Sequence, residues 1–176
     1  SAGRPDAAET ILRAVRRVTP EPGPSITLAA AEAALDSAHG AEAAPPLEDV
    51  IESRSAMSPR ALIRLVDDAI RRDRDISVET ADLADSLARE HRDTALGASL
   101  RRARVLARAQ SGDLDAAAAA LRAITQAELP LERPATLGPF WQRVAGAASD
   151  ETFLRLALNV PGGREGVPEL VGNQVG

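Results

Sequence analysis

The chain of 176 residues contains no cysteine, no lysine and no tyrosine. Without cysteine it can form neither a disulfide nor a thiolate metal site or nucleophile, which is compatible with either the cytoplasm or the periplasm. It has no run of about 20 apolar residues, so we expect no direct membrane insertion. Aromatic residues make up only 2% of the chain. A core must therefore be built from Leu, Ile, Val and Ala.

The charge of the chain excludes one class of partner. All 21 basic residues are arginine, and 26 acidic residues bring the net charge to −5. Proteins that bind nucleic acid neutralise phosphates and stack bases on aromatic rings, so we expect no nucleic-acid partner. Arginine in place of lysine is typical of a GC-rich bacterial genome. Since Ser1-Ala2-Gly3 is unlike a native start, we expect a fragment of a soluble bacterial protein, periplasmic or envelope-associated rather than cytoplasmic.

The apolar pattern of the chain is helical. Alanine is the best helix former, apolar residues recur at spacings of three and four, and no segment alternates as a strand would. Pro and Gly, twelve of each, cluster between these segments. The sequence therefore predicts an all-α fold of about seven or eight short helices with little or no sheet. We expect one domain over 1–158, with a sub-boundary at 41–46, and a Pro/Gly-rich tail over 159–176.

Start and stop signals place the individual helices. Thr27, Ser77 and Ser149 are expected to cap helices, and Ser58-Pro59 to begin one. The Pro-rich stretch from Leu129 to Pro139 is expected to connect helices without being helical. Helices are predicted over 6–18, 28–38, 58–72, 78–91, 96–110, 114–127, 140–148 and 152–158, with a short one beginning near Pro46. The core hairpins would occupy 58–127 and the closing hairpin 137–158.

The clearest hairpin runs from Leu96 to Ala127. Gly112 can adopt a left-handed conformation that ends the first helix, and Asp113 is placed to accept the free N–H groups of the second. Two apolar stripes joined by so short a turn predict an antiparallel pair packed face to face. The stripes consist of Leu96, Leu100, Ala103 and Ala107 in the first helix and Leu114, Ala117, Ala118, Leu121 and Ile124 in the second.

The hairpin resembles a tetratricopeptide repeat over residues 94–127. Gly112 and Asp113 match the Gly-Asp turn of that family, Asp115 its acidic position and Ala117 the small residue that lets the second helix pack closely. The first helix departs from the pattern at Arg101, Val105 and Arg108. The resemblance covers about half of one repeat and leaves a generic helical hairpin as the alternative. It implies a right-handed α-solenoid-like array.

A repeat should recur at the family period of about 34 residues. That shift moves Leu62 and Val66 onto Leu96 and Leu100, whereas the next shift forward places Pro130 and Pro134 where a helix should be. Two repeats would need flanking helices to cap them. The resemblance further implies a concave groove lined by the first helices of the hairpins, 58–72 and 96–110.

The sequence offers little catalytic or metal chemistry. Asp73, Asp75 and Ser77 match the first ligand positions of a calcium-binding loop, but Val78 stands where Gly is needed and Ala84 where the final Glu should be. The two histidines, His39 and His91, belong to no metal-binding spacing, and there is no Gly-x-Ser-x-Gly turn. We therefore expect no enzyme, no catalytic residue, no metal and no cofactor.

Arginine is the most concentrated charge. Arginine forks grip carboxylates, so we expect partner contacts, weakly predicted, from Arg64, Arg101, Arg104 and Arg108, toward a protein or peptide partner with an acidic segment. The competing interpretation is a solvated helix face balanced by nearby Asp and Glu. Phe140 and Trp141 also allow two interpretations. We favour core anchors over an exposed binding hot spot.

These features together predict a non-catalytic protein–protein interaction or scaffold module. One alternative is an oligomerisation or assembly domain of a larger bacterial envelope or secretion protein, which would form a homo-oligomer. Another is a helical bundle that binds a small ligand or catalyses a reaction. That alternative requires a closed polar pocket, which the sequence does not indicate.

Overall fold

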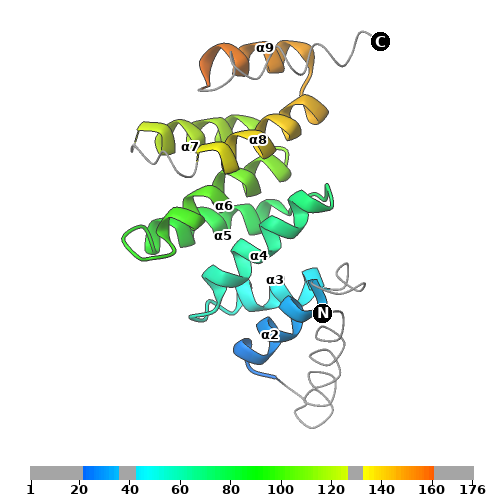
Figure 1. Ribbon diagram of the computed structural model, residues 1–176, viewed down its shortest axis with the longest axis vertical. Coiled ribbons are helices and arrows are strands. Elements are labelled where there is room, and N and C mark those ends of the chain that lie inside the picture. The colour runs from blue at the N-terminus through cyan, green and yellow to red at the C-terminus, as the bar shows by residue number, and fades with distance from the viewer. Residues whose placement is uncertain (1–21, 36–42, 127–132, 161–176) are drawn as a thin grey trace. The chain divides into compact units, whose positions relative to one another are not determined.

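The computed structural model describes residues 22–35, 43–126 and 133–160 (Figure 1). Within these ranges the chain forms eight α-helices, α2 to α9, and no strand. The prediction of an all-α fold is therefore confirmed. Contacts divide the chain into two units, residues 1–68 and 69–176, and each unit is described by itself. The single domain expected over 1–158 stays a prediction.

Several predicted features lie outside the described residues. They are the helix over 6–18, His39, the first part of the boundary at 41–46, and the tail from residue 161. Within the part of the chain that the structure describes, no helix has the length and apolar character needed to cross a membrane.

The first unit contains α2 (Pro24–Leu35), α3 (Ala44–Glu52) and most of α4 (Ser58–Arg71). α2 packs against α3, and each buries one apolar stripe. The hydroxyl of Ser58 is buried and donates to the carbonyl of Val50 at 2.8 Å, which ties the start of α4 to α3. The buried apolar residues of α2 and α3 are Leu28, Ala30, Ala31, Leu35, Ala44, Leu47, Val50 and Ile51.

The prediction that Thr27 caps α2 is wrong. α2 begins at Pro24, where proline costs nothing because the first N–H groups of a helix have no partner in it. Thr27 lies inside the first turn, and its hydroxyl donates back to the carbonyls of Pro22 (3.2 Å) and Gly23 (3.3 Å). A threonine near a helix start can satisfy either the N–H groups or the carbonyls, and here it satisfies carbonyls.

The second unit contains the last residues of α4, then α5 (Val78–Glu90), α6 (Gly97–Gln110), α7 (Leu114–Gln126), α8 (Arg133–Ala147) and α9 (Asp150–Asn159). α6 is the centre of this unit because it packs against α5, α7 and α8 (Figure 1). None of its residues is fully exposed. The predicted helix 96–110 is thus the central helix of the unit, and its polar side keeps Arg101, Arg104 and Arg108 only partly buried.

Short-range capping signals were predicted correctly in this unit. Ser77 Oγ accepts the N–H of Thr80 at 3.1 Å, Asp113 Oδ1 that of Ala116 at 3.1 Å, and Ser149 Oγ that of Thr152 at 3.3 Å. Gly112 has a φ of +85° and ends α6, as expected. Each signal acts within four residues, so no information from the rest of the fold is needed.

The predicted non-helical connection from Leu129 to Pro139 is wrong over its second half. α8 begins at Arg133 and contains Pro139 in its interior. Pro134 falls in the first turn, where a missing N–H is harmless, whereas Pro139 removes one backbone hydrogen bond from the helix. Burial of Phe140, Trp141 and Val144, within the five residues that follow Pro139, anchors the helix despite that loss.

Phe140 and Trp141 are core residues, as favoured from the sequence. Both are buried, their rings meet edge to face at 5.1 Å, and Trp141 meets Phe153 of α9 in the same way at 6.1 Å. Leu96, by contrast, precedes α6 and is 41% exposed, although the predicted stripe included it. Leu154 and Leu158 of α9 are the most exposed leucines of the described residues.

The helices recur at a longer spacing than the one that was expected. The helices α4, α6 and α8 begin at Ser58, Gly97 and Arg133, which lie 39 and then 36 residues apart. The first spacing exceeds the second because the linker between α4 and α5 is longer than the Ser111–Asp113 linker between α6 and α7. A shift of 34 residues therefore does not superpose the helix ends, and membership in the tetratricopeptide family stays a prediction.

Candidate functional site

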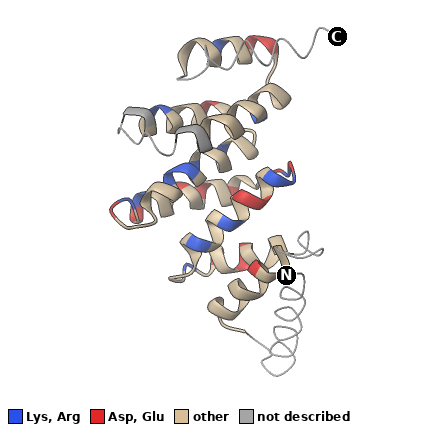
Figure 2. Ribbon diagram, viewed as in Figure 1, with Lys and Arg blue, Asp and Glu red and all other residues tan. Residues whose placement is uncertain are grey.

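Three of the predicted partner-contact residues lie on one face of α6. Arg101, Arg104 and Arg108 are three and four residues apart, so they form one stripe along the helix. The stripe faces α5, because Arg104 and Arg108 both bond to Asp85 of that helix. Figure 2 marks the basic and acidic positions along the helices. The structure therefore brings together three of the four predicted arginines.

Arg108 is the inner member of this stripe. Its side chain is only 12% exposed, and its Nη2 donates to Asp82 Oδ1 at 2.6 Å and to Asp85 Oδ2 at 2.7 Å. Asp113 lies further off, with 4.0 Å between its Oδ2 and Nη1. The hydrogen bond to Asp85 raises the pKa of Arg108 above its ordinary value. Arg108 thus serves to join α6 to α5.

Asp85 is the carboxylate that Arg104 and Arg108 share. Arg104 Nε donates to Asp85 Oδ1 at 2.6 Å. Burial by itself would raise the pKa of the Asp85 carboxyl, but the hydrogen bonds from Arg108 and Arg104 outweigh burial and hold that pKa below its ordinary value. Asp85 is consequently an anion over the whole neutral range.

Two further arginines, Arg89 of α5 and Arg101 of α6, donate to backbone carbonyls and bind no carboxylate among the described residues. Arg89, one turn beyond Asp85 on α5, donates its Nε to the Asp85 carbonyl at 3.1 Å. Arg101 donates Nη1 to the carbonyl of Arg92 at 3.2 Å, and its Nε is buried without a hydrogen-bond partner. Carbonyls fix the direction of these guanidinium groups but leave their full positive charge uncompensated.

Arg64 belongs to the other unit and to a different cluster. Its Nε donates to Glu32 Oε1 of α2 at 3.1 Å, while Arg60 holds both oxygens of the same carboxylate at 2.7 and 2.8 Å. Burial would raise the pKa of Glu32, and the two arginines reverse that effect and lower it. Arg64 therefore helps to join α2 to α4 within the first unit.

Sequence reasoning missed the acidic residues of the α5–α6 cluster. The competing interpretation expected nearby Asp and Glu to balance the arginines but named none, and Asp85 lies 19 and 23 residues before the arginines with which it pairs. The available signal was Asp82 and Asp85, three residues apart on the helix that precedes the arginine stripe. Neighbouring antiparallel helices offer such stripes to one another, but their rotation about the helix axes is set by packing.

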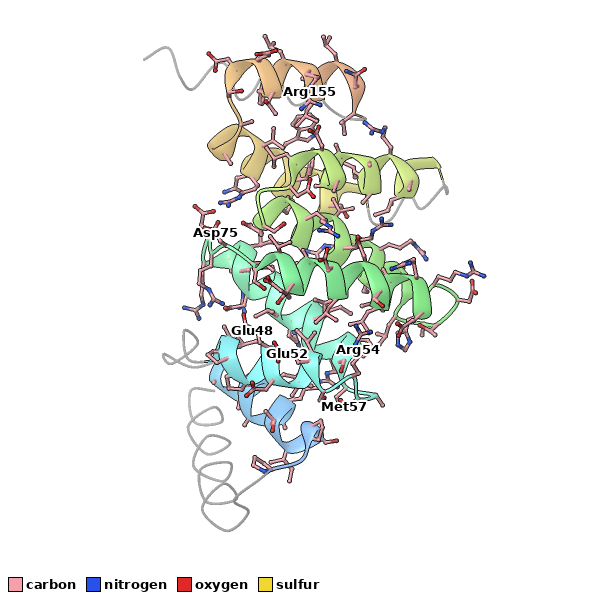
Figure 3. The ribbon with its side chains drawn as sticks, turned by 180° about the vertical axis from the view of Figure 1, so that it is seen from behind. Glu48, Glu52, Arg54, Met57, Asp75 and Arg155 are labelled. Carbon is pink, nitrogen blue, oxygen red and sulfur yellow. The ribbon has the colours of Figure 1, made fainter. Side chains whose placement is uncertain are left out.

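The loop whose Asp73 and Asp75 match the start of a calcium site instead contacts Arg143 of α8. Arg143 pairs with Asp75 through Nη2 and with Asp73 through Nη1 at 3.7 Å, and it also reaches the carbonyls of Ala109 and Gln110 at 3.4 Å. One guanidinium thus links the α4–α5 loop, the end of α6 and α8. Arg155 of α9 similarly holds Asp115 of α7 at 2.6 and 3.1 Å (Figure 3).

The described residues contain no group of three or more His, Asp or Glu side chains placed to hold a metal ion. Their distinctive chemistry is the arginine–carboxylate pairing between helices. Comparison of the chain with family models, curated proteins and solved structures found no match. The function must therefore be argued from this geometry.

Proposed function

We propose that the protein is a non-catalytic module that binds a protein or peptide partner on the helices of its second unit. The observation that carries this proposal is the packing of α6, which contacts α8 as well as its sequence neighbours α5 and α7. Thus α6 and α8 lie side by side, although α7 separates them in the sequence. Such an arrangement presents a surface broad enough for an extended segment or a helix of a partner.

The charged groups of this unit agree with a binding role. Its ion pairs join different helices, and the unit also contains Arg89 and Arg101, whose charge no carboxylate of the described residues balances. Arginine is enriched where protein partners meet, because its planar fork binds carboxylates bidentately. A scaffold that positions such groups needs no reactive side chain.

Photo-crosslinking in the cells that make the protein would test this proposal. A photoreactive residue at Gln142, which is exposed on α8 beside Arg143, is expected to capture a discrete partner protein. The matched position is Ala119, which is exposed on α7 and lies on a helix that the proposed surface does not include. Capture that is equal at both positions, or absent at Gln142, would contradict the proposal.

The same experiment separates the oligomerisation alternative. A crosslink between two copies of the chain has twice the mass of one copy and is identified by its peptides. If Gln142 captures only a second copy, the surface is an assembly interface and the interaction proposal is wrong.

A further inference from the structure

We propose that Arg89, Arg101 and Arg104, arranged around Asp85, form an arginine surface that binds an acidic segment of a partner protein. This inference rests on the proposed function and specifies the chemistry of the partner. All three arginines lie in the second unit, on α5 and α6, and each is fixed by a hydrogen bond to that pair of helices or the turn between them.

The arrangement leaves donors available. Arg104 uses only Nε for Asp85, its side chain is 36% exposed, and its two terminal nitrogens bond to no described residue. Arg89 is exposed and likewise uses only Nε. Two guanidinium ends held by their Nε atoms are oriented in advance, so a carboxylate can bind them without first ordering a mobile side chain.

The local charge favours an anion. Residues 82–108 contain six arginines and four acidic residues, although the whole chain has a net charge of −5. Asp93 is paired with Arg92 at 3.0 Å, and Asp82 and Asp85 are paired with Arg104 and Arg108. Arg89 and Arg101, by contrast, have only backbone carbonyls as acceptors among the described residues. An acidic segment would complement this excess.

Arg108 is not part of this surface. Its side chain is only 12% exposed, against 36% for Arg104, and two carboxylates already bind it, so its role is to hold Asp85 in place. Arg64 is engaged by Glu32 in the first unit. Of the four arginines expected from the sequence, the arginine surface therefore contains only Arg101 and Arg104. Arg89 is an addition that the sequence analysis did not name.

A peptide fits this surface better than a nucleic acid does. The three aromatic residues of the chain are Phe140, Trp141 and Phe153, and all lie on α8 and α9, so α5 and α6 offer no ring on which a base could stack. The net negative charge of the chain would also repel a long phosphate backbone. A short carboxylate-bearing segment needs no ring and carries fewer charges for the chain to repel.

Fluorescence anisotropy with defined probes tests the inference on the full chain. The probe is a fluorescein-labelled peptide in which six Glu alternate with six Gly, and Gln replaces Glu in the control peptide. We expect the acidic peptide to bind and the control peptide to bind at least about tenfold more weakly. Arg104→Gln and Arg101→Gln should each weaken binding of the acidic peptide by about tenfold, the loss expected for one charge-assisted contact.

Arg155→Gln is the matched variant. Arg155 also pairs with an aspartate on a neighbouring helix at 2.6 Å, but it lies on α9, so its removal deletes the same charge and the same kind of ion pair. It should change binding by less than twofold, and far-ultraviolet circular dichroism checks that each variant is folded. Equal weakening by Arg104→Gln and Arg155→Gln would show a net-charge effect and overturn the inference.

Three other outcomes also test the two proposals. A labelled thymidine oligonucleotide of the same charge that binds as tightly as the peptide would overturn the choice of an acidic protein segment. A partner crosslinked at Gln142 without any affinity for the acidic peptide would overturn this inference and leave the proposed function standing. Peptide binding without a crosslinked partner would count against the proposed function alone.

Discussion

Two glycines are required at the ends of α6 for different physical reasons. At Gly97, where the helix begins, a Cβ would overlap the carbonyl of Arg92 and lie 2.8 Å from that of His91, both of which are backbone atoms that cannot move aside alone. At Gly112, where the helix ends, a Cβ would meet nothing within 4 Å, and the constraint is the φ of +85°. The first position is limited by space and the second by backbone conformation.

We predict that Gly97→Ala lowers the free energy of unfolding by about 1–3 kcal/mol, because the overlap must be relieved by a shift of the α5–α6 turn. Urea denaturation followed by circular dichroism measures the change. A loss under about 0.5 kcal/mol would mean that the turn adapts freely.

We predict that Gly112→Ala costs about 1 kcal/mol, since an L-residue with a side chain disfavours the left-handed region. Gly146→Ala in α8 is the control. Gly146 is helical and exposed, and its Cβ would also meet nothing, so alanine there should stabilise the protein by up to about 1 kcal/mol. Changes of the same sign at both positions would contradict the conformational explanation.

At the scale of the helices, arginine–carboxylate pairs supplement the apolar packing of the second unit. Arg108 and Arg104 join α6 to α5, Arg143 joins α8 to the end of α6, and Arg155 joins α9 to α7. Pairs at an exposed surface add little stability, whereas half-buried ones with several hydrogen bonds add more. The Asp85 cluster is of the second kind.

We predict that Asp85→Asn lowers the free energy of unfolding by about 1–3 kcal/mol at neutral pH, because it leaves the mostly buried Arg108 with one carboxylate in place of two. Asp115→Asn removes the exposed partner of Arg155 and should leave the urea midpoint nearly unchanged. Equal effects of the two substitutions would show that burial of the cluster does not matter.

The stability of the native protein should also depend on pH through Asp85. Its folded pKa lies below the ordinary value of 3.8, so the unfolded chain takes up a proton first as the pH falls. The stabilisation is complete above that ordinary value and is lost as the pH falls through the folded pKa. Urea midpoints measured from pH 7 to pH 3 should therefore fall less steeply for Asp85→Asn than for the native chain, and parallel curves would refute the linkage.

The sequence predicted those helix ends that depend on near neighbours. Ser77, Asp113 and Ser149 act through their own side chains, and Gly112 through its lack of one, so their roles could be predicted directly. Pro139 could not, because its cost in α8 is balanced by apolar residues that pack against other helices. The Thr27 hydroxyl could accept from a backbone N–H or donate to a backbone carbonyl. It donates to carbonyls because α2 begins at Pro24, before Thr27.

Only some of the arginines of the candidate site could be predicted from the sequence, and the aspartate that pairs with them could not. The sequence offered Arg101, Arg104 and Arg108 as candidates, and their spacing of three and four places them on one side of the observed helix. That Asp85 faces two of them, and that Arg89 lies beside it, depends on how α5 is rotated against α6. That rotation follows from the packing of both apolar faces, which a single sequence does not specify.

At the scale of the whole molecule, the proposed function predicts a monomer. Light scattering should give a mass near 18.4 kDa that stays constant over a wide range of concentrations, since a surface kept for another protein is free in the isolated chain. A mass that rises with concentration to a stable dimer would favour the oligomerisation alternative. Crosslinking at Gln142 would then show whether α8 forms the dimer interface.

The single tryptophan makes the C-terminal helices observable on their own. Trp141 is buried between Phe140 and Phe153, and the chain has no tyrosine, so ultraviolet emission excited at 295 nm, roughly the red edge of protein absorption, comes from the joint of α8 and α9 alone. Opening of that joint would move the emission to longer wavelength while most of the helical circular dichroism persists. The molecule thus carries its own optical probe for whether its last two helices separate before the rest unfolds.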